Sequence, residues 1–357
     1  MGGLPFRLTT ALLALPGLAL AVLGGINIEQ RRVFQLPCDG VTWADSPRGV
    51  TAWVVARDGP GNRAGILEGD ILRAINERPA LFAADAAREV FRTGVWSQAA
   101  YELIRRGEIV RVKVVVAPQE SVGAIRHYLE TLGLVYLALG AIILVRRRTT
   151  QQWAPLHVFC LASFALYAFA YTGKLDALDW TVYWVNVIAL LVQPAIFLHF
   201  CLSFPDQRDL FLHRGHSSWL LYLPAAFLLA LHVLVALRVL VAPLSLQALR
   251  WVLDRAELIY LTAYFLAGAA ILERGRRRSR ETPLQLQLKL LARGTLAAIL
   301  PFATLYALPY FLGFIPAPWM TSSVFSLIFL PLTLGYTLFR SAFAHMRPLS
   351  QPAESPL

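Results

Sequence analysis

The side chains most often used for catalysis form no recognisable catalytic or metal-binding pattern in this sequence. A zinc protease requires His-Glu-x-x-His on a helix, and none of the seven histidines is followed by glutamate. Three serines in the apolar stretches lack the Gly-x-Ser context of intramembrane serine proteases; these are Ser163, Ser203 and Ser326. One histidine and two cysteines at similar depth lack paired ligand spacing; these are His157, Cys160 and Cys201. We therefore expect no catalytic residue, no metal and no cofactor.

Five ionisable residues in or beside apolar stretches are the candidates for a binding site within a membrane. Polar groups there are costly and by default indicate function. The candidates are Lys174, His199, Arg238, Asp254 and Glu257. We expect Arg238 to pair with Asp254 or Glu257 near the outer membrane face, where the pair either lines a ligand cavity or only joins two helices. We expect His199 to hydrogen-bond a neighbouring helix such as the one that carries His157.

The composition requires a membrane around these residues. Of the 357 residues, 57% are hydrophobic and only 15% are charged, and the mean hydropathy is +0.55. Such a chain is too apolar for a soluble protein of this length. A helix needs about 20 mostly apolar residues to cross a bilayer. Eight stretches meet this requirement: 8–28, 122–145, 155–172, 181–204, 218–241, 251–272, 294–314 and 319–339.

The distribution of basic residues predicts the orientation of the chain. The net charge is +11, and arginine runs at 146–148 and 274–280 follow the second and sixth apolar stretches. Basic residues favour the cytoplasmic side, so we expect a multi-pass protein with both termini in the cytoplasm. Residues 31–120 then lie outside, because long segments are translocated largely regardless of charge. We expect the basic residues to contact anionic lipids rather than nucleic acid.

The first apolar stretch has two interpretations. Arg7, the apolar run and Ala19-Leu20-Ala21 fit both a first transmembrane helix at 1–30 and a cleavable signal peptide. Both interpretations place the segment that follows outside the cytoplasm.

Residues 38–117 predict a small α+β domain between the first two membrane helices. Alternating patterns indicate strands at 41–44, 50–55, 71–75, 101–104 and 110–116. A turn is expected at 46–49, a helical turn at 64–67, and a helix at 84–92 that ends at Gly94. Cys38 has no partner cysteine on this side of the membrane. The predicted fold class is mixed: about eight transmembrane helices with a small inserted α+β domain.

One phrase in this segment resembles bacterial PDZ domains. It consists of Ala64-Gly65-Ile66, two further residues, Gly69-Asp70 and a strand that ends in Asn76. PDZ domains bind an extended peptide at a sheet edge beside a helix, and backbone N–H groups capture the terminal carboxylate. The resemblance implies a carboxylate loop at Asp39, Gly40, Val41 and Thr42, and a groove helix with Ala87, Val90 and Phe91 on one side. Its partner would be the C-terminus or an internal segment of a peptide or protein.

Two residues depart from what this resemblance requires. Asp39 would repel a peptide carboxylate unless Arg48 or Arg88 offsets its charge. Glu77 stands where the family has glycine after Asn76, so we expect a turn that differs from the usual Asn-Gly type. The alternative to peptide capture is a domain that only packs or dimerises.

The membrane part resembles the multispan sensor regions of bacterial histidine kinases of the competence-pheromone receptor type. The matching features are His199-Phe200-x-Leu202-x-Phe204-Pro205, the stretch 171–175 with Asp179-Trp180, and Gln287-Leu288-Lys289 before Gly294. The resemblance implies a seven-helix sensor-like domain at 121–340 in a bacterial inner membrane, with a PDZ-like insert at 31–120. The chain departs from the family after Arg340, because the Pro-containing tail 341–357 cannot hold a kinase domain. We expect neither kinase nor protease activity.

Two functions follow from these predictions. The first is a sensor that binds a peptide or protein outside the membrane and signals to a cytoplasmic histidine kinase or response partner. The second is an adaptor that holds an envelope protein, or a second copy of the chain, without signal transfer.

Overall fold

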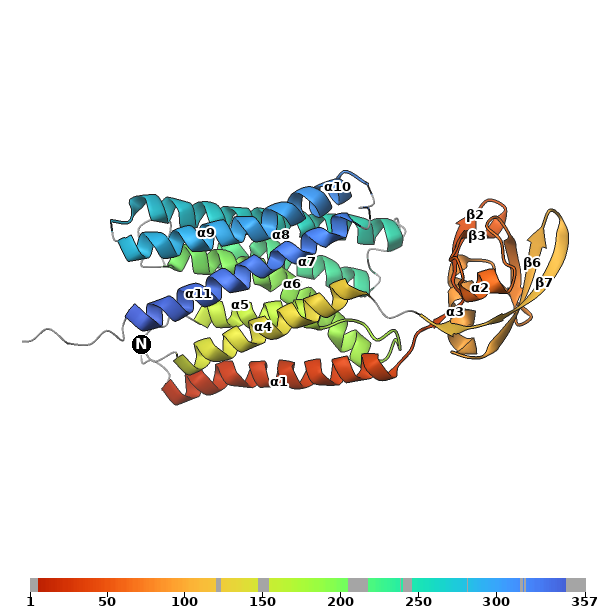
Figure 1. Ribbon diagram of the computed structural model, residues 1–357, viewed down its shortest axis with the longest axis horizontal. Helices are drawn as coiled ribbons and strands as arrows, with labels where there is room; N and C mark the ends of the chain where they lie inside the picture. Colours follow the sequence, from red (N-terminus) through yellow and green to blue (C-terminus); the bar gives the residue numbers. More distant parts are fainter. Residues whose placement is uncertain are drawn as a thin grey trace, which may run out of the picture. The chain divides into compact units, whose positions relative to one another are not determined.

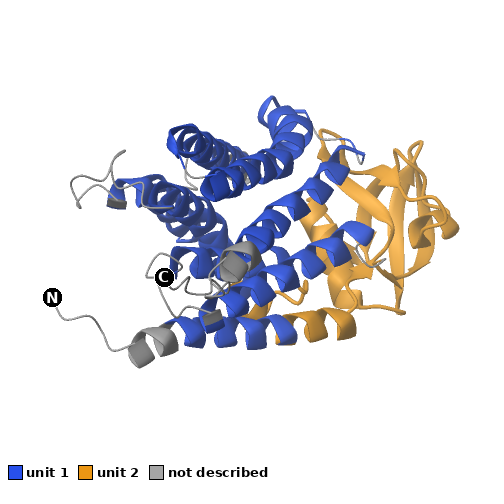
Figure 2. Cartoon of the chain, turned by 60° about the vertical axis from the view of Figure 1, so that its left-hand side comes forward, with its two compact units in different colours: residues 1–25, 123–170, 181–357 blue, residues 26–122, 171–180 orange. Residues whose placement is uncertain are grey.

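The structure is a computed structural model that describes residues 6–119, 123–146, 154–204, 218–237, 239, 246–280, 282–314, 317 and 319–344. The chain divides into two compact units, shown in Figure 2. The helical unit comprises residues 1–25, 123–170 and 181–357, and the insert unit comprises residues 26–122 and 171–180. Each unit is described by itself below.

The helices follow the apolar stretches of the sequence (Figure 1). Their bounds are α1 Phe6–Val33, α4 Ala124–Arg146, α5 Ala154–Ala168, α6 Ala177–Ser203, η2 Ser218–Tyr222, α7 Leu223–Ala236, α8 Leu246–Arg278, α9 Thr282–Phe302, η3 Ala303–Ala307, α10 Leu308–Phe311, η4 Met320–Ile328 and α11 Phe329–Ala344. Among the described residues, seven helical runs are long and apolar enough to cross a membrane, with mean hydropathies of 1.4 to 2.1. This finding is consistent with a multi-pass membrane protein.

The third predicted span, 155–172, is the one that the structure does not support. Its helix α5 has 15 residues, a length of about 22 Å, whereas the hydrocarbon core of a bilayer is about 30 Å thick. Most of its side chains are buried, including those of Phe159, Cys160 and Phe164. The stretch is apolar because α5 lies in the interior of the helical unit, and the sequence pattern of a buried helix resembles that of a span.

Aromatic side chains fill the interior of the helical unit. Phe159 of α5 packs edge-on against Tyr136 of α4, with ring centroids 5.8 Å apart. The Phe159 ring also lies 5.5 Å from that of Phe197 on α6, which stacks on Phe265 of α8 at 4.7 Å. These contacts join four helices through one continuous cluster.

A π-helical turn interrupts the region after α9. Pro301 lies inside α9, and the π-helical turn η3 begins two residues later. Proline lacks the N–H that a regular helical turn requires, so a local widening of the helix is expected at this point. The turn precedes α10, and it carries Tyr306.

The insert unit contains an antiparallel sheet with two helices (Figure 1). The strands of this sheet are β2 Val41–Ser46, β3 Gly49–Val55, β4 Ile71–Ile75, β5 Arg78–Pro79, β6 Gln98–Arg105 and β7 Glu108–Val115. Their order is β2-β3-β4-β6-β7, and β5 pairs with β4. The helices are α2 Pro60–Arg63 and α3 Ala83–Thr93. The short strands β1 Pro37–Cys38 and β8 Ala117–Pro118 pair with each other where the chain enters and leaves this domain.

The core of the insert unit explains why the alternation of apolar residues in the sequence predicts its strands. The buried side chains alternate along the strands and recur on one face of α3; they include Val50, Ala52, Leu72, Ile75, Ala86, Val90, Tyr101, Leu103 and Val114. Each predicted strand overlaps a strand of the structure, and the helix ends before Gly94 as predicted. The predicted helical turn at 64–67 is wrong in position, because the helix lies at α2, where Pro60 occupies a first-turn position.

The turn between β4 and β5 also differs from the prediction. Ile75 pairs with Arg78, which leaves Asn76 and Glu77 as a two-residue hairpin loop. Both have positive φ values, 48° and 63°, so the turn keeps the left-handed geometry of an Asn-Gly hairpin despite the glutamate. The Asn76 side chain holds the turn, because its Oδ1 accepts the Ala100 N–H at 2.9 Å and its Nδ2 donates to Thr93 Oγ1 at 3.0 Å.

Candidate functional site

The edge of strand β2 is the first candidate for a binding surface in the insert unit. One side of β2 pairs with β3 from Val41↔Val55 to Ser46↔Gly49. Its other side pairs with no strand in the described part of the chain. An open strand edge presents backbone N–H and C=O groups to which a further extended segment can hydrogen-bond.

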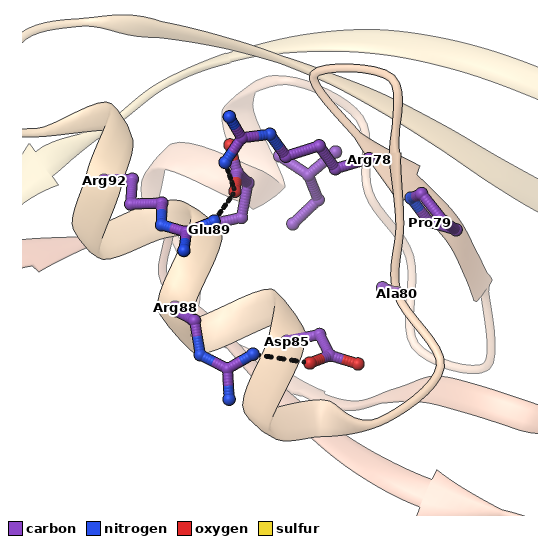
Figure 3. A pocket seen from close by; sticks show the side chains of 8 residues that line it. Arg78, Pro79, Ala80, Asp85, Arg88, Glu89 and Arg92 are labelled. Carbon is purple, nitrogen blue, oxygen red and sulfur yellow. Dashed lines mark hydrogen bonds and ion pairs between the residues drawn. The ribbon is translucent and has the colours of Figure 1, made fainter.

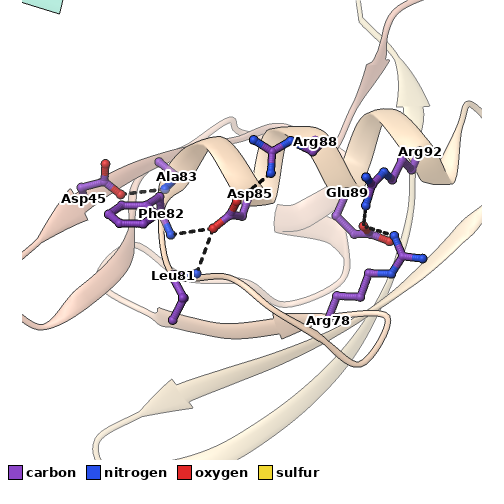
Figure 4. Close-up of polar contacts among 9 residues, drawn as sticks. All are labelled: Asp45, Arg78, Leu81, Phe82, Ala83, Asp85, Arg88, Glu89 and Arg92. Carbon is purple, nitrogen blue, oxygen red and sulfur yellow. Dashed lines mark hydrogen bonds and ion pairs between the residues drawn. The ribbon is translucent and has the colours of Figure 1, made fainter. Parts of the chain in front are cut away.

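Helix α3 flanks this edge with a row of three residues. Ala83, Ala87 and Phe91 are spaced four apart, so they share one face of the helix. The Ala83 N–H donates to Asp45 Oδ1 of β2 at 2.6 Å, which places the first turn of α3 beside the end of β2 (Figure 4). Ala87 is exposed and Phe91 is 37% exposed. Val90, which the sequence analysis grouped with them, is only 5% exposed and belongs to the core.

The first turn of α3 is fixed by two carboxylates. Asp85 accepts the backbone N–H groups of Leu81 and Phe82 at 3.2 and 3.0 Å, and it pairs with Arg88 at 2.9 Å (Figure 4). Asp45 accepts the N–H of Ala83 from across the groove. Together they satisfy orphan donors of the helix N-terminus and hold it against the end of β2.

The loop before β2 contains a buried carboxylate. Asp39 is only 4% exposed. Its Oδ1 accepts the Val41 N–H at 3.1 Å, and its Oδ2 accepts Trp43 Nε1–H and the Tyr101 hydroxyl, both at 2.9 Å. Burial is the largest cause that raises the pKa of Tyr101, and the charge of Asp39 and the hydrogen bond to it raise this pKa further. The phenol therefore keeps its proton and donates it in the hydrogen bond.

Neither arginine proposed to offset Asp39 does so. Arg88 pairs with Asp85 instead. Arg48 lies in the turn between β2 and β3, at the opposite end of β2 from Asp39. No ion pair in the described part of the chain involves Asp39.

The opposite face of α3 borders a small pocket of about 180 Å³, shown in Figure 3. Its charged lining residues pair among themselves: Arg78 and Arg92 contact Glu89 at 3.1 and 3.5 Å, and Arg88 contacts Asp85. The three arginine side chains are largely exposed, so these pairs contribute at most about 1 kcal/mol each. The pair of Arg78 with Glu89 joins β5 to α3, whereas the other two pairs lie within α3.

Asp70 of the Gly-Asp phrase has a structural role. Its carboxylate, 3% exposed, accepts Arg105 Nε–H at 2.8 Å, Arg105 Nη2–H at 2.7 Å and the Leu67 N–H at 2.9 Å. Burial alone would raise the pKa of Asp70, but the Arg105 hydrogen bonds, the Leu67 hydrogen bond and the Arg105 charge outweigh it, so the pKa is lowered. The Gly-Asp phrase therefore ties the turn before β4 to the end of β6.

Lys174 contacts the last turn of α1 and the residue that follows this helix. Its ammonium group lies 5.5 Å from the centroid of the Phe34 ring and donates to Gln30 Oε1. The Phe34 ring in turn packs against Phe91 of α3 at 6.5 Å. All of these residues belong to the insert unit. They connect the residues after α1 to the face of α3 that flanks the groove.

Two of the ionisable candidates meet in a cavity of the helical unit. The cavity has a volume of about 230 Å³ and is lined by Leu190, Asp254, Glu257, Leu258, Leu261, Tyr306 and Tyr310. Asp254 accepts the Tyr310 hydroxyl at 3.3 Å. Glu257, 8% exposed, contacts His232 Nε2, and His232 Nδ1 lies 3.0 Å from the Tyr183 hydroxyl.

The remaining expectations for the helical unit are resolved in part. Arg238 lies outside the described residues. Among the residues that the structure describes, Glu257 contacts His232, which the sequence analysis missed. His232 lies on α7 and would have been found only by considering every polar residue at a similar depth. His199 contacts the Tyr222 hydroxyl at 2.9 Å, so it bonds a neighbouring helix as expected, although this helix is η2 and not the helix of His157. His157 contacts the carbonyl oxygens of Gly140 and Leu13 at 2.9 and 3.1 Å.

No family model matches the chain, and no curated protein matches it. The chain is similar to the solved structure of the HtrA-type protease AlgW with a decapeptide, with 24% identity, coverage of 25% of this chain and 31% of that chain, and a TM-score of 0.24. A second structure of that protease with a decapeptide has 23% identity, coverage of 29% and 36%, and a TM-score of 0.25. The serine endoprotease from Yersinia pestis has 24% identity, coverage of 24% and 30%, and a TM-score of 0.22. The chain thus spans about a third of the length of these proteins, and likeness at such TM-scores assigns no activity to it.

Proposed function

We propose that this chain is a membrane-embedded protein-binding module, and that its PDZ-like insert domain binds an extended segment of a partner protein along β2. The observation that carries the proposal is the open edge of β2 beside the row Ala83, Ala87 and Phe91 on α3. Backbone hydrogen bonds to a strand edge supply affinity, and the flanking helix supplies selectivity for alternate side chains.

The residues of this row suit a groove. Ala87 is small and exposed, so it leaves space above β2 for side chains of the bound segment. Phe91 offers a partly exposed aromatic ring toward the end of α3. Asp45 holds the helix N-terminus against β2, so this contact fixes the separation of α3 and β2 at that end of the groove.

The sensor role is the finer part of the proposal. The arginine distribution supports an insert domain outside the membrane and termini in the cytoplasm. The contact of Phe91 with Phe34, directly after α1, supports a route by which a segment in the groove would shift the end of that helix. A cytoplasmic partner would then read the shift. An adaptor would use the same groove without such a shift.

A substitution inside the groove tests peptide binding. Ala87→Arg places a long cation over β2 at an exposed helical position that arginine tolerates well. We expect it to abolish the binding of segments selected from a random peptide library on the full chain in detergent. The matched control is Ala100→Arg, because Ala100 is an exposed alanine on β6, away from β2 in the sheet. Equal binding by both variants and the unmodified chain would exclude this groove.

Co-purification separates the sensor from the adaptor. A sensor is expected to retain a cytoplasmic histidine kinase or response regulator in detergent, and this association should change when a selected peptide is added. Recovery of envelope proteins alone, unchanged by peptide, would favour the adaptor.

A further inference from the structure

The loop at the start of β2 uses its own hydrogen-bond donors. The Val41 N–H donates to Asp39 Oδ1 at 3.1 Å, and the Gly40 N–H donates to Cys38 Sγ at 3.3 Å. A loop that captures a terminal carboxylate needs such N–H groups free and pointing at the ligand. In this chain an internal carboxylate already occupies one of them.

The loop is also held in this conformation from the other side. The Gly61 N–H donates to the Asp39 carbonyl at 2.7 Å, and the Ala56 N–H donates to the Gly40 carbonyl at 2.9 Å. Gly40 has a φ of +72°, and a Cβ atom there would lie 2.9 Å from Pro60 Cδ. Because the peptide units are fixed by both carbonyl groups, the N–H groups cannot turn outward without breaking these contacts.

The charge of Asp39 adds a second obstacle to a terminal carboxylate. Its three donors, the Val41 N–H, Trp43 Nε1–H and the Tyr101 hydroxyl, are neutral. No described arginine or lysine forms an ion pair with Asp39. A second carboxylate beside this loop would meet an uncompensated like charge at low local dielectric, which is unfavourable.

We propose that the β2 edge binds an internal segment of its partner, whose chain continues past the Asp39 loop, and discriminates against free C-termini. This inference rests on the proposed function, because it names the class of partner that the same groove accepts. The open edge of β2 supplies backbone pairing, which an internal segment needs, while the loop withholds the carboxylate site that a chain end needs.

The test presents the same random segments to the full chain in detergent in two forms. In one form the segment ends in a free carboxylate. In the other form it is followed by a glycine-serine linker and a folded carrier domain. We expect segments to be enriched in the internal form. For each selected sequence, the synthetic free acid should bind at least about threefold more weakly than its C-terminal amide. A free acid that binds as tightly as its amide, or more tightly, would overturn the inference and leave the proposed function intact.

Failure of the proposed function gives a different result. If neither form enriches segments whose binding is lost in Ala87→Arg, the groove does not bind peptides, and both proposals are overturned.

Two variants isolate the charge of Asp39. Asp39→Asn keeps an oxygen for the Val41 N–H but removes the negative charge, so we expect the free acid to gain at least about threefold in affinity relative to the amide. Tyr101→Phe removes one donor to Asp39 and retains its charge, so its acid-to-amide ratio should stay unchanged. Thermal unfolding reports whether each variant folds. Should Asp39→Asn fail to fold, the acid-to-amide ratio of the unmodified chain still decides the question.

Discussion

Two buried carboxylates, one in each unit, pair in different ways. Asp70 of the insert unit accepts two hydrogen bonds from the guanidinium group of Arg105 and one from the backbone of Leu67. Glu257 of the helical unit contacts a single nitrogen of His232, whose other nitrogen contacts the Tyr183 hydroxyl. The first pair is charged and forked, whereas the second belongs to a chain of single contacts between α6, α7 and α8.

The surroundings of the two pairs lead to different expectations for stability. When the insert domain unfolds, water hydrates Asp70 and Arg105, so loss of one partner in the folded state leaves a buried charge without compensation. When membrane helices separate, their polar groups find other partners in the bilayer, and measured interhelical hydrogen bonds average about 0.6 kcal/mol. Polar pairing should therefore stabilise the insert domain more than the helical unit, where close packing carries more of the stability.

The largest effect is expected for Asp70→Ala. Removal of the carboxylate leaves Arg105, which is 30% exposed, with one remaining contact to the Gly65 carbonyl. We expect the free energy of unfolding of the insert domain to fall by about 3 kcal/mol. This value is the lower end of the range for a broken buried ion pair, because the Arg105 side chain stays partly hydrated. The measurement is the urea midpoint for proteolysis of the insert domain in the detergent-solubilised chain. The control is Arg111→Ala, whose exposed pair with Glu102 should cost less than about 1 kcal/mol.

The pH dependence of stability provides a second test of the pair Asp70 and Arg105. The folded pKa of Asp70 is lowered, so its stabilising contribution is present above the unfolded pKa and is lost as the pH falls through the folded pKa. Asp70→Asn should remove that part of the acid dependence. An identical decline of stability with acid in Asp70→Asn and the unmodified chain would contradict the role of this pair.

Packing in the helical unit is tested by Gly294→Ala. A Cβ atom at Gly294 of α9 would lie 2.7 Å from Thr333 Cβ of α11, which cannot move away without a shift of the helix. We expect a loss of about 2 kcal/mol, in the range for overpacked interiors. The measurement is unfolding in mixed detergent and SDS micelles. Gly25→Ala is the matched control, because a Cβ there meets no atom within 4 Å. Equal stability of the two variants would show that α9 and α11 do not pack this closely.

A smaller effect is expected for the contact of His232 with Glu257 in the helical unit. A double-mutant cycle with His232→Phe and Glu257→Gln should give a coupling of about 0.6 kcal/mol, the average for membrane hydrogen bonds. The same micelle unfolding assay measures it. A coupling of about 3 kcal/mol, as large as the loss of stability expected for Asp70→Ala, would break the distinction between the two units.

The two units also differ in how far the sequence predicts them. In the insert unit, alternation of buried and exposed residues fixes the strands, and β4 has the predicted bounds Ile71–Ile75. In the helical unit the helices are apolar on all sides, so no pattern shows which faces meet. The sequence therefore supported the predicted pairing of Arg238 with Asp254 or Glu257 no better than the observed contact of Glu257 with His232. The short helix α5 looked like a span for the same reason.

Within the binding site, the elements were predictable but the orientation of single side chains was not. The segments for β2 and α3 followed from the PDZ-like phrase and its spacing. Asp39 was expected at the mouth of the loop, yet it is buried against Tyr101, a residue 62 positions away in the chain. Such a contact depends on tertiary packing, and local sequence does not determine it. Ala87 and Val90 show the same limit. They are three residues apart on α3, yet Ala87 is exposed and Val90 belongs to the core.

The smallest expected effect concerns the turn at Asn76 and Glu77. Glu77 is exposed and has a φ of 63°, a left-handed conformation that costs a residue with a Cβ atom about 1 to 2 kcal/mol. Glu77→Gly removes this strain but adds conformational entropy to the unfolded chain, worth about 0.5 to 1 kcal/mol. We expect a net gain of about 0.5 kcal/mol in the urea assay of the insert domain. Glu77→Gln retains the Cβ atom and loses only the charge, so it should leave stability unchanged. If glutamine stabilised the domain as much as glycine, the charge of Glu77 and not its left-handed backbone would be the source of the destabilisation. The positive φ of Glu77 would then contribute no measurable loss of stability.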